Sequence, residues 1–158
     1  MRTANPRTRN PKSSATLSRR ITHSLAKNDE KSQCGDGCSL IIMDRYTHFV
    51  DAFPAPDKAA ESTLAALRSF LGEAKAERIY CDGSGVLKAV CKSMQILPDT
   101  STPRRPEANG VAERAVRRVA EGTRPVLLQS GLPHRWWAEA ARCYCVSRNV
   151  CDPAGSNE

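Results

Sequence analysis

The stretch CSLIIMD, residues 38–44, is the feature that most restricts how this chain can fold. It is mostly apolar, long enough for one buried strand and too short for a buried helix. A second extended stretch, YTHFVDAFP, follows after a tight connection at residues 44–46, and Pro54 and Pro56 are expected to end it. Together these two stretches predict a β-hairpin.

Helical and extended segments alternate after the hairpin. Apolar residues 64, 67, 70 and 71 share one face at helical spacing, which predicts a helix capped by Asp57 and running to about Glu73. RIYCD then predicts a strand, VLKAVCKSM a short helix and ILPDTS an extended piece. A long helix is expected from about Asn109, with Pro125 kinking or splitting it near Thr123. With a closing helix over about 134–149, this order predicts an α/β fold.

The bulk properties suggest a single basic domain. A chain of 158 residues suffices for one core. Its formal charge of +7 favours a polyanionic partner, nucleic acid before a membrane surface. No apolar run approaches the ~20 residues of a membrane span, so we expect a soluble intracellular protein, with the nucleus as one possible location.

Composition divides the chain into three parts. Residues 1–20 are rich in Arg and Ser and contain no acid. They predict a disordered basic arm, with an organelle-targeting peptide as the alternative. The folded domain is expected over 21–152, and a disordered tail over 153–158.

Seven cysteines are irregularly spaced, and we interpret them as reduced thiols, several of them buried. Cys34 and Cys38 could also contribute two zinc ligands, with His23 or His48 completing the set. The absence of a second matching pair argues against a zinc site.

Two acids stand where chemistry could occur. Asp82 ends a predicted strand before Gly-Ser-Gly, at the edge where open α/β sheets place ligands. Glu113 lies one turn into the long predicted helix, among arginines. Paired carboxylates suit divalent cations, and neighbouring arginines suit a phosphate backbone. A plain turn acid and a solvated helix face are the alternatives.

Four segments resemble one known family. ANGVAERAVRR resembles the Asn-Gly-Val-Ala-Glu-Arg signature of retroviral and retrotransposon integrase cores, particularly those of copia-type elements. IIMDRYTHFVDAFPAPDKAAES is similar to that core's paired strands, and IYCDGSGVLKA to the block around its second catalytic acid. RPVLLQSGLPHRWWAEAA is similar to its closing helical segment. The four lie in the family's order over about residues 22–150.

This resemblance implies a ribonuclease-H-like fold, a mixed sheet flanked by helices, truncated at its N-terminal side because the family's zinc-binding region has no counterpart here. It implies two-metal DNA strand transfer with Mg²⁺ or Mn²⁺ as cofactor. Asp82 would be the second acid and Glu113 the third, both as metal ligands. DNA is the implied partner, with RNA as an alternative, and a homo-oligomer is possible as in integrases.

The first acid of the family is the point of departure. The best match sets His23 where the family has Asp, and Asp29 and Asp36 are alternatives in what should be a loop. A histidine does not supply the negative charge that two Mg²⁺ ions require. The resemblance therefore implies an integrase-core homologue with an impaired active site. A non-enzymatic nucleic-acid-binding module and a ribonuclease-H-like nuclease are the alternative functions.

Several polar residues are candidates for nucleic-acid contact. Trp136 and Trp137 could stack on bases, but beside Ala140 and Tyr144 they are expected in the core. The stronger candidates are Lys88, Lys92, Arg104, Arg105, Asn109, Arg114, Arg117 and Arg118.

Overall fold

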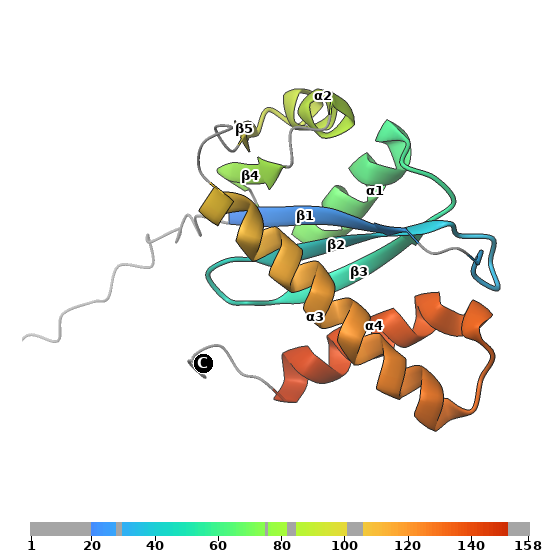
Figure 1. The fold of residues 1–158 in the computed structure, drawn as a ribbon. Helices are drawn as coiled ribbons and strands as arrows, with labels where there is room; N and C mark the ends of the chain where they lie inside the picture. The colour runs from blue at the N-terminus through green and yellow to red at the C-terminus, as the bar shows by residue number, and fades with distance from the viewer. Residues whose placement is uncertain (1–19, 28–29, 75, 82–84, 101–105, 152–158) are drawn as a thin grey trace, which may run out of the picture.

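The central feature is one five-stranded mixed sheet with strand order β3-β2-β1-β4-β5 (Figure 1). The computed structural model describes residues 20–27, 30–74, 76–81, 85–100 and 106–151, and all statements below concern these. β1 (Arg20–Lys27) is central; it pairs antiparallel with β2 (Cys38–Asp44), which pairs antiparallel with β3 (Val50–Ala55). On its other side β1 runs parallel to β4 (Arg78–Cys81), and β4 runs parallel to β5 (Leu97–Thr100).

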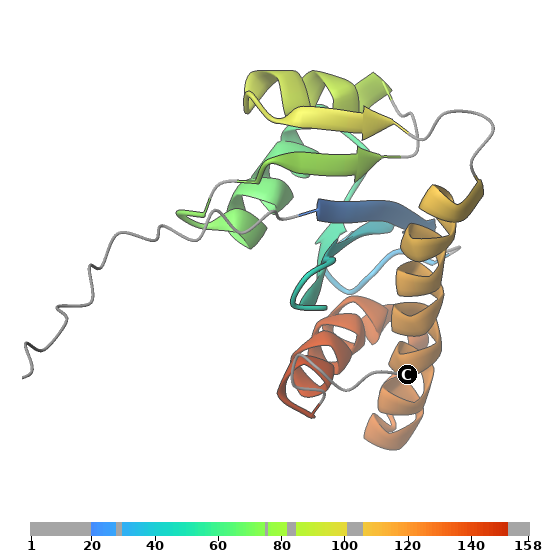
Figure 2. The same cartoon turned by 90° about the vertical axis from the view of Figure 1, so that its left-hand side faces the viewer.

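Helices cover both faces of the sheet. α1 (Ala60–Leu71) and α2 (Gly85–Ser93) pack on one face, in a cluster that includes Leu67, Ile79 and Leu87. α3 (Pro106–Ser130) and α4 (Trp137–Cys151) pack on the other, and a short 3₁₀ helix, η1 (His134–Trp136), precedes α4 (Figures 1 and 2). The predicted fold class, an α/β fold with a mixed sheet flanked by helices, is confirmed.

β2 supplies core residues to both layers. Leu40 and Ile42 belong to the cluster under α1 and α2, whereas Ile41 and Met43 belong to the cluster under α3 and α4. Alternate residues of a strand point to opposite faces, so a run apolar at successive positions is buried on both sides. The continuous apolar run of residues 38–44 is therefore explained by a sheet covered on both faces.

Two predicted boundaries differ from the structure. The second hairpin strand begins at Val50, because residues 45–47 form a turn instead of extending the strand. α1 begins at Ala60, and its N-cap residue is Ala59, so the prediction that Asp57 caps the helix is wrong. The Asp57 carboxylate instead accepts a hydrogen bond from the Ala59 backbone N–H at 2.9 Å, in the turn before the helix.

Of the two outcomes predicted for Pro125, a kink or a split, the split does not occur, since α3 continues through Pro125 to Ser130. A proline within a helix removes one backbone hydrogen bond, the one its N–H would give to the carbonyl four residues earlier. That residue, Glu121, is exposed, so water can solvate its carbonyl. The loss of this one hydrogen bond is offset by the packing of the helix, whose residues Ala115 and Val119 belong to the buried cluster.

Parts of the expected organisation lie outside the described residues. These are the basic arm except Arg20, which begins β1, and the tail at 153–158. Within the described residues, no helix combines the length and apolar character needed to span a bilayer.

Candidate functional site

Glu113 lies on the solvent-exposed side of α3 together with Arg114, Arg117 and Arg118. The opposite side of the helix is fixed by packing, because Ala115 and Val119 are buried in the cluster that includes Ile41 and Met43 of β2. With three guanidinium groups and one carboxylate, this stretch of α3 carries a net positive charge. Such a surface attracts a phosphate backbone and leaves a carboxylate accessible to a cation.

β1 contains no Asp or Glu, since its sequence is RITHSLAK. His23, the residue matched to the family's first acid, lies opposite Ile42 in the pairing with β2. Ile42 belongs to the cluster under α1 and α2. The neighbouring positions Thr22 and Ser24 lie opposite Met43 and Ile41, which pack in the cluster under α3 and α4.

Other predicted site residues are only partly placed. Asp82, Arg104 and Arg105 lie outside the described residues; β4 ends at the position before Asp82. Asn109 belongs to the first turns of α3, where the backbone alone is described.

Lys88 and Lys92 are exposed on α2, which covers the sheet face opposite α3. The structure therefore does not bring these lysines together with the α3 arginines into one surface. The sequence prediction grouped them because it carried no information on which face each helix covers.

The loop before β2 holds the alternative acid Asp36. Its Oδ2 accepts a hydrogen bond from the Ser32 hydroxyl at 2.6 Å, and its backbone N–H donates to the Ser32 Oγ at 2.9 Å. Asp36 thus forms a local turn of the loop, as expected. Asp29, the other alternative, lies outside the described residues.

No three His, Cys, Asp or Glu side chains within the described residues are grouped so that they could hold a metal ion. For the zinc alternative, Cys38 is buried with its thiol 3.4 Å from the Ala55 carbonyl oxygen. His48 follows the opposite end of β2, about 20 Å away at ~3.3 Å per strand residue. Cys38 and His48 therefore cannot share one zinc ion.

Of the paired tryptophans, Trp137 belongs to the interior, as expected, whereas Trp136 in η1 is only half-buried. Trp137 is 4% exposed, and its indole N–H donates to the Glu30 carbonyl at 3.0 Å. Gln33 strengthens this junction by donating its backbone N–H to the Arg135 carbonyl at 2.7 Å. The tryptophan thus anchors the loop before β2 to the start of α4.

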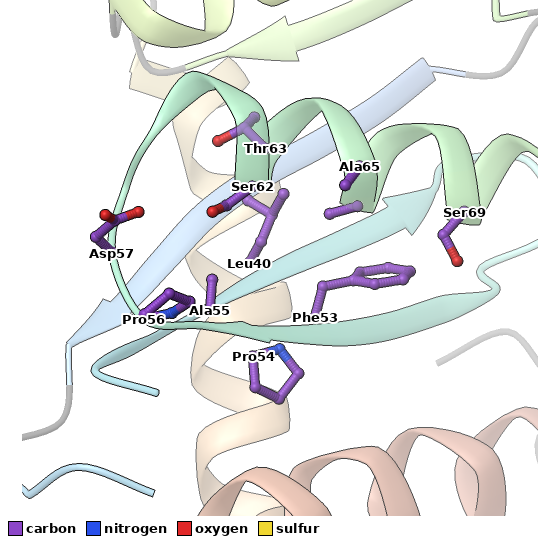
Figure 3. Close-up of a pocket in the computed structure, with 11 residues that line it drawn as sticks. Leu40, Phe53, Pro54, Ala55, Pro56, Asp57, Ser62, Thr63, Ala65 and Ser69 are labelled. Atoms are coloured by element: carbon purple, nitrogen blue, oxygen red, sulfur yellow. The ribbon is translucent and has the colours of Figure 1, made fainter. Parts of the chain in front are cut away.

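A pocket lies between the end of β3 and α1 (Figure 3). Its volume is about 320 Å³, and its lining includes Leu40, Phe53 and Pro54 on one side and Ser62, Ala65 and Ser69 on the other. Leu40 belongs to the cluster under α1 and α2, so this pocket is on the face opposite Glu113. It is separate from the candidate site on α3.

Sequence reasoning missed two features near the sheet. The Arg45 guanidinium lies over the ring of Tyr80, with its Cζ 4.8 Å from the ring centroid. Burial raises the pKa of the Asp51 carboxyl, while the Ala52 N–H and Arg142 oppose the rise. The sequence did carry one signal for Tyr80. It is an aromatic residue next to Ile79 in a predicted strand, so its side chain points to the face opposite that of Ile79.

Comparison with known proteins supports the integrase resemblance. No family model matches the chain. Over 86 residues, half of the chain, it is 33% identical to the retrovirus-related Pol polyprotein from transposon TNT 1-94 of Nicotiana tabacum, and it spans 6% of that polyprotein's length. The crystal structure of the catalytic core domain of BIV integrase superposes with a TM-score of 0.63 over 84% of each chain, at 17% sequence identity. The chain is thus similar in sequence to a retrotransposon Pol polyprotein and has the ribonuclease-H-like fold of a retroviral integrase catalytic core.

Proposed function

We propose that this chain is a DNA-binding homologue of retroelement integrase cores whose strand-transfer site is impaired. One observation carries the proposal. The central strand β1 contains no carboxylate, whereas Glu113 remains exposed on α3 among arginines. The similarity to a transposon Pol polyprotein and to an integrase core supplies the chemical context.

The available donors do not fit the metal pair of an active enzyme. The resemblance implies two ions held by three acids, and Asp82 and Glu113 are the two that the sequence retains. An imidazole at His23 is neutral or positive and cannot supply the bridging charge that two Mg²⁺ or Mn²⁺ ions need. We therefore assign no strand-transfer step to these residues.

DNA binding requires less than catalysis does. Arg114, Arg117 and Arg118 are exposed on one helix, and the whole chain carries a formal charge of +7. Arginine side chains that neutralise phosphates release counterions, which gives an affinity that falls steeply with salt and depends little on sequence. This is the binding behaviour expected of the chain.

Fluorescence anisotropy of a labelled DNA duplex, measured over a salt series, tests the binding. Arg117→Ala and Arg118→Ala are each expected to weaken binding and to reduce the slope of log K against log salt by about 0.9. Arg68→Ala is the matched control, because Arg68 is exposed in the last turn of α1 on the other face. Binding that does not change with salt would contradict the DNA-binding proposal.

A strand-transfer assay on a labelled DNA end, in Mg²⁺ or Mn²⁺, tests the impairment. No product is expected from the natural protein. Product formation would show that another group replaces the first carboxylate. Of the two loop acids, Asp29 and Asp36, Asp36 is the weaker candidate to replace the first carboxylate, because its own carboxylate is hydrogen-bonded to Ser32 within the loop.

A further inference from the structure

Arg45 and Tyr80 form a contact that crosses the central strand. Arg45 follows directly after β2, and Tyr80 belongs to β4, with β1 between these two strands in the sheet. The guanidinium carbon lies 4.8 Å from the centroid of the tyrosine ring, within the range of a cation–π interaction. Both side chains are half-buried. The contact therefore fixes a positive charge over the sheet.

The pairing of the strands tells which face carries this charge. Ile79 is fully buried in the cluster under α1 and α2, so the next residue, Tyr80, points to the other face. Tyr80 lies opposite Thr22, and Thr22 lies opposite Met43, which packs in the cluster with α3. Arg45 and Tyr80 are thus on the same face as α3 and its Glu113.

This part of the face is open at the outer strands. Leu97 of β5 is 67% exposed, and Arg78 of β4 is exposed as well. Figure 2 shows α3 and α4 beside β1, β2 and β3, with β4 and β5 extending beyond them. The sheet face next to Tyr80, whose ring Arg45 covers, is therefore accessible at these two strands.

We propose that Arg45, held in place by Tyr80, contacts a phosphate group of bound DNA on the α3 face. This inference rests on the DNA binding proposed above and adds the position of a contact outside α3. Stacking uses the flat side of a guanidinium and leaves its N–H edge available, and that edge matches the oxygens of a phosphate. A guanidinium already held by a ring also loses less side-chain freedom on binding.

The strand beneath the contact supports a phosphate over a metal as the partner of Arg45. β1 supplies no carboxylate beside Arg45, and Asp99, the β5 residue opposite Tyr80, is paired with Arg78 at 3.7 Å. A fixed guanidinium repels cations and attracts phosphate. DNA binding that involves Arg45 is therefore expected to persist when divalent ions are removed by EDTA.

The test uses the full chain, a labelled DNA duplex, EDTA and a salt series. Arg45→Ala is expected to weaken binding about threefold to tenfold and to reduce the salt slope by about 0.9. Tyr80→Phe keeps the ring and should bind as the natural protein does. Tyr80→Leu removes the ring but not the charge, so affinity should fall while the salt slope is retained. Arg68→Ala again serves as the control arginine.

Each result decides between the two proposals. If Arg45→Ala matches Arg68→Ala in affinity and slope while Arg117→Ala is weakened, the Arg45 contact is wrong and DNA binding along α3 stands. If Arg45→Ala lowers the melting temperature and affinity without changing the slope, Arg45 has only a structural role and the contact is also wrong. If the natural protein binds no DNA, both proposals fail.

Discussion

The side-chain amide of Asn149 on α4 pairs with both backbone groups of Val50 on the edge strand β3. Its Nδ2 donates to the Val50 carbonyl at 2.8 Å, and its Oδ1 accepts from the Val50 N–H at 3.1 Å. The outer side of an edge strand presents backbone N–H and C=O groups that no neighbouring strand pairs with. Here the Asn149 side-chain amide bonds one such N–H and one such C=O, both of Val50. Arg148 adds a third bond, from its guanidinium to the His48 carbonyl at 3.0 Å. These bonds attach the end of α4 to the start of β3.

Asn149→Ala is expected to lower the free energy of unfolding by about 1–3 kcal/mol, because two hydrogen bonds are lost and the Val50 groups lose their partner. Urea unfolding measures the change. Ser147→Ala, at an exposed position of the same helix, is the control and should be nearly neutral. Equal stability of the two variants would show that water replaces Asn149 without cost.

Gly122 lets α3 and α4 approach closely. A Cβ added at Gly122 would overlap the ring of Tyr144 on α4. Gly122→Ala is expected to destabilise the fold, because displacing a packed ring costs about 1–3 kcal/mol and the better helix propensity of Ala returns about 0.5–1 kcal/mol. Thermal or urea unfolding checks the sign.

The same helix offers a matched control for this substitution. At Gly110 an added Cβ would meet only the flexible Arg114 side chain, at 3.4 Å, so Gly110→Ala should be neutral or stabilising. In a Tyr144→Ala background the cost of Gly122→Ala should disappear. Equal effects of Gly110→Ala and Gly122→Ala would contradict the close-packing explanation.

The thiol of Cys145 makes the fold sensitive to alkaline pH. Burial raises the pKa of Cys145 from 9.0 to about 12; the carboxylate of Asp51 adds to the rise, and Arg148 opposes it. Between about pH 9 and pH 12 the unfolded chain loses this proton while the folded chain keeps it. The contribution is therefore complete below pH 9 and is lost as pH rises to about 12.

Cys145→Ala is expected to be less stable at neutral pH, because it removes buried volume, but to lose less stability between pH 9 and pH 12. Unfolding in urea at several pH values measures both effects. Cys143→Ala, at an exposed cysteine on the same helix, should keep the slope of the natural protein. Parallel pH curves for Cys145→Ala and the natural protein would refute the role of Cys145.

The strands β2, β3, β4 and β5 were predicted from the sequence because their signal is local, whereas the central strand β1 was not predicted from its own pattern. Residues 38–44 and 78–81 are short apolar or alternating runs, and each became a strand of the sheet. The break at Pro125 was mispredicted because local propensity gave way to packing. α3 is buried along one side, and this packing outweighs one missing hydrogen bond. The N-cap was misplaced because the Asp57 carboxylate accepts its bond from the Ala59 N–H in the turn before the helix.

The candidate site could be predicted only in part. Glu113 and the α3 arginines were found because they lie close together on one predicted helix. The separation of Lys88 and Lys92 onto the opposite face depends on how the sheet is assembled, which a single sequence does not reveal. The contact of Arg45 with Tyr80 joins two strands across a third, so no local pattern indicated it.

The pairing of β1 with β2 distinguishes two positions for the first acid that the resemblance implies. His23 lies opposite Ile42, and Ile42 belongs to the cluster under α1 and α2. Ser24 lies opposite Ile41, and Ile41 belongs to the cluster that includes Ala115 of α3. Carboxylates that share metal ions must lie on one face. Ser24→Asp is therefore expected to restore Mn²⁺ binding and strand transfer more than His23→Asp does.

Titration calorimetry with Mn²⁺ and a strand-transfer assay on a labelled DNA end compare the two variants, with Ser24→Asn as the uncharged control. Product from Ser24→Asp alone would confirm the pairing and identify position 24 as that of the first acid. Product from His23→Asp alone would restore the assignment made from the sequence and show that the register near Ile42 does not decide the site. If neither variant binds Mn²⁺, the loss at the site extends beyond β1, because one restored carboxylate would not then complete a metal-binding set with Asp82 and Glu113.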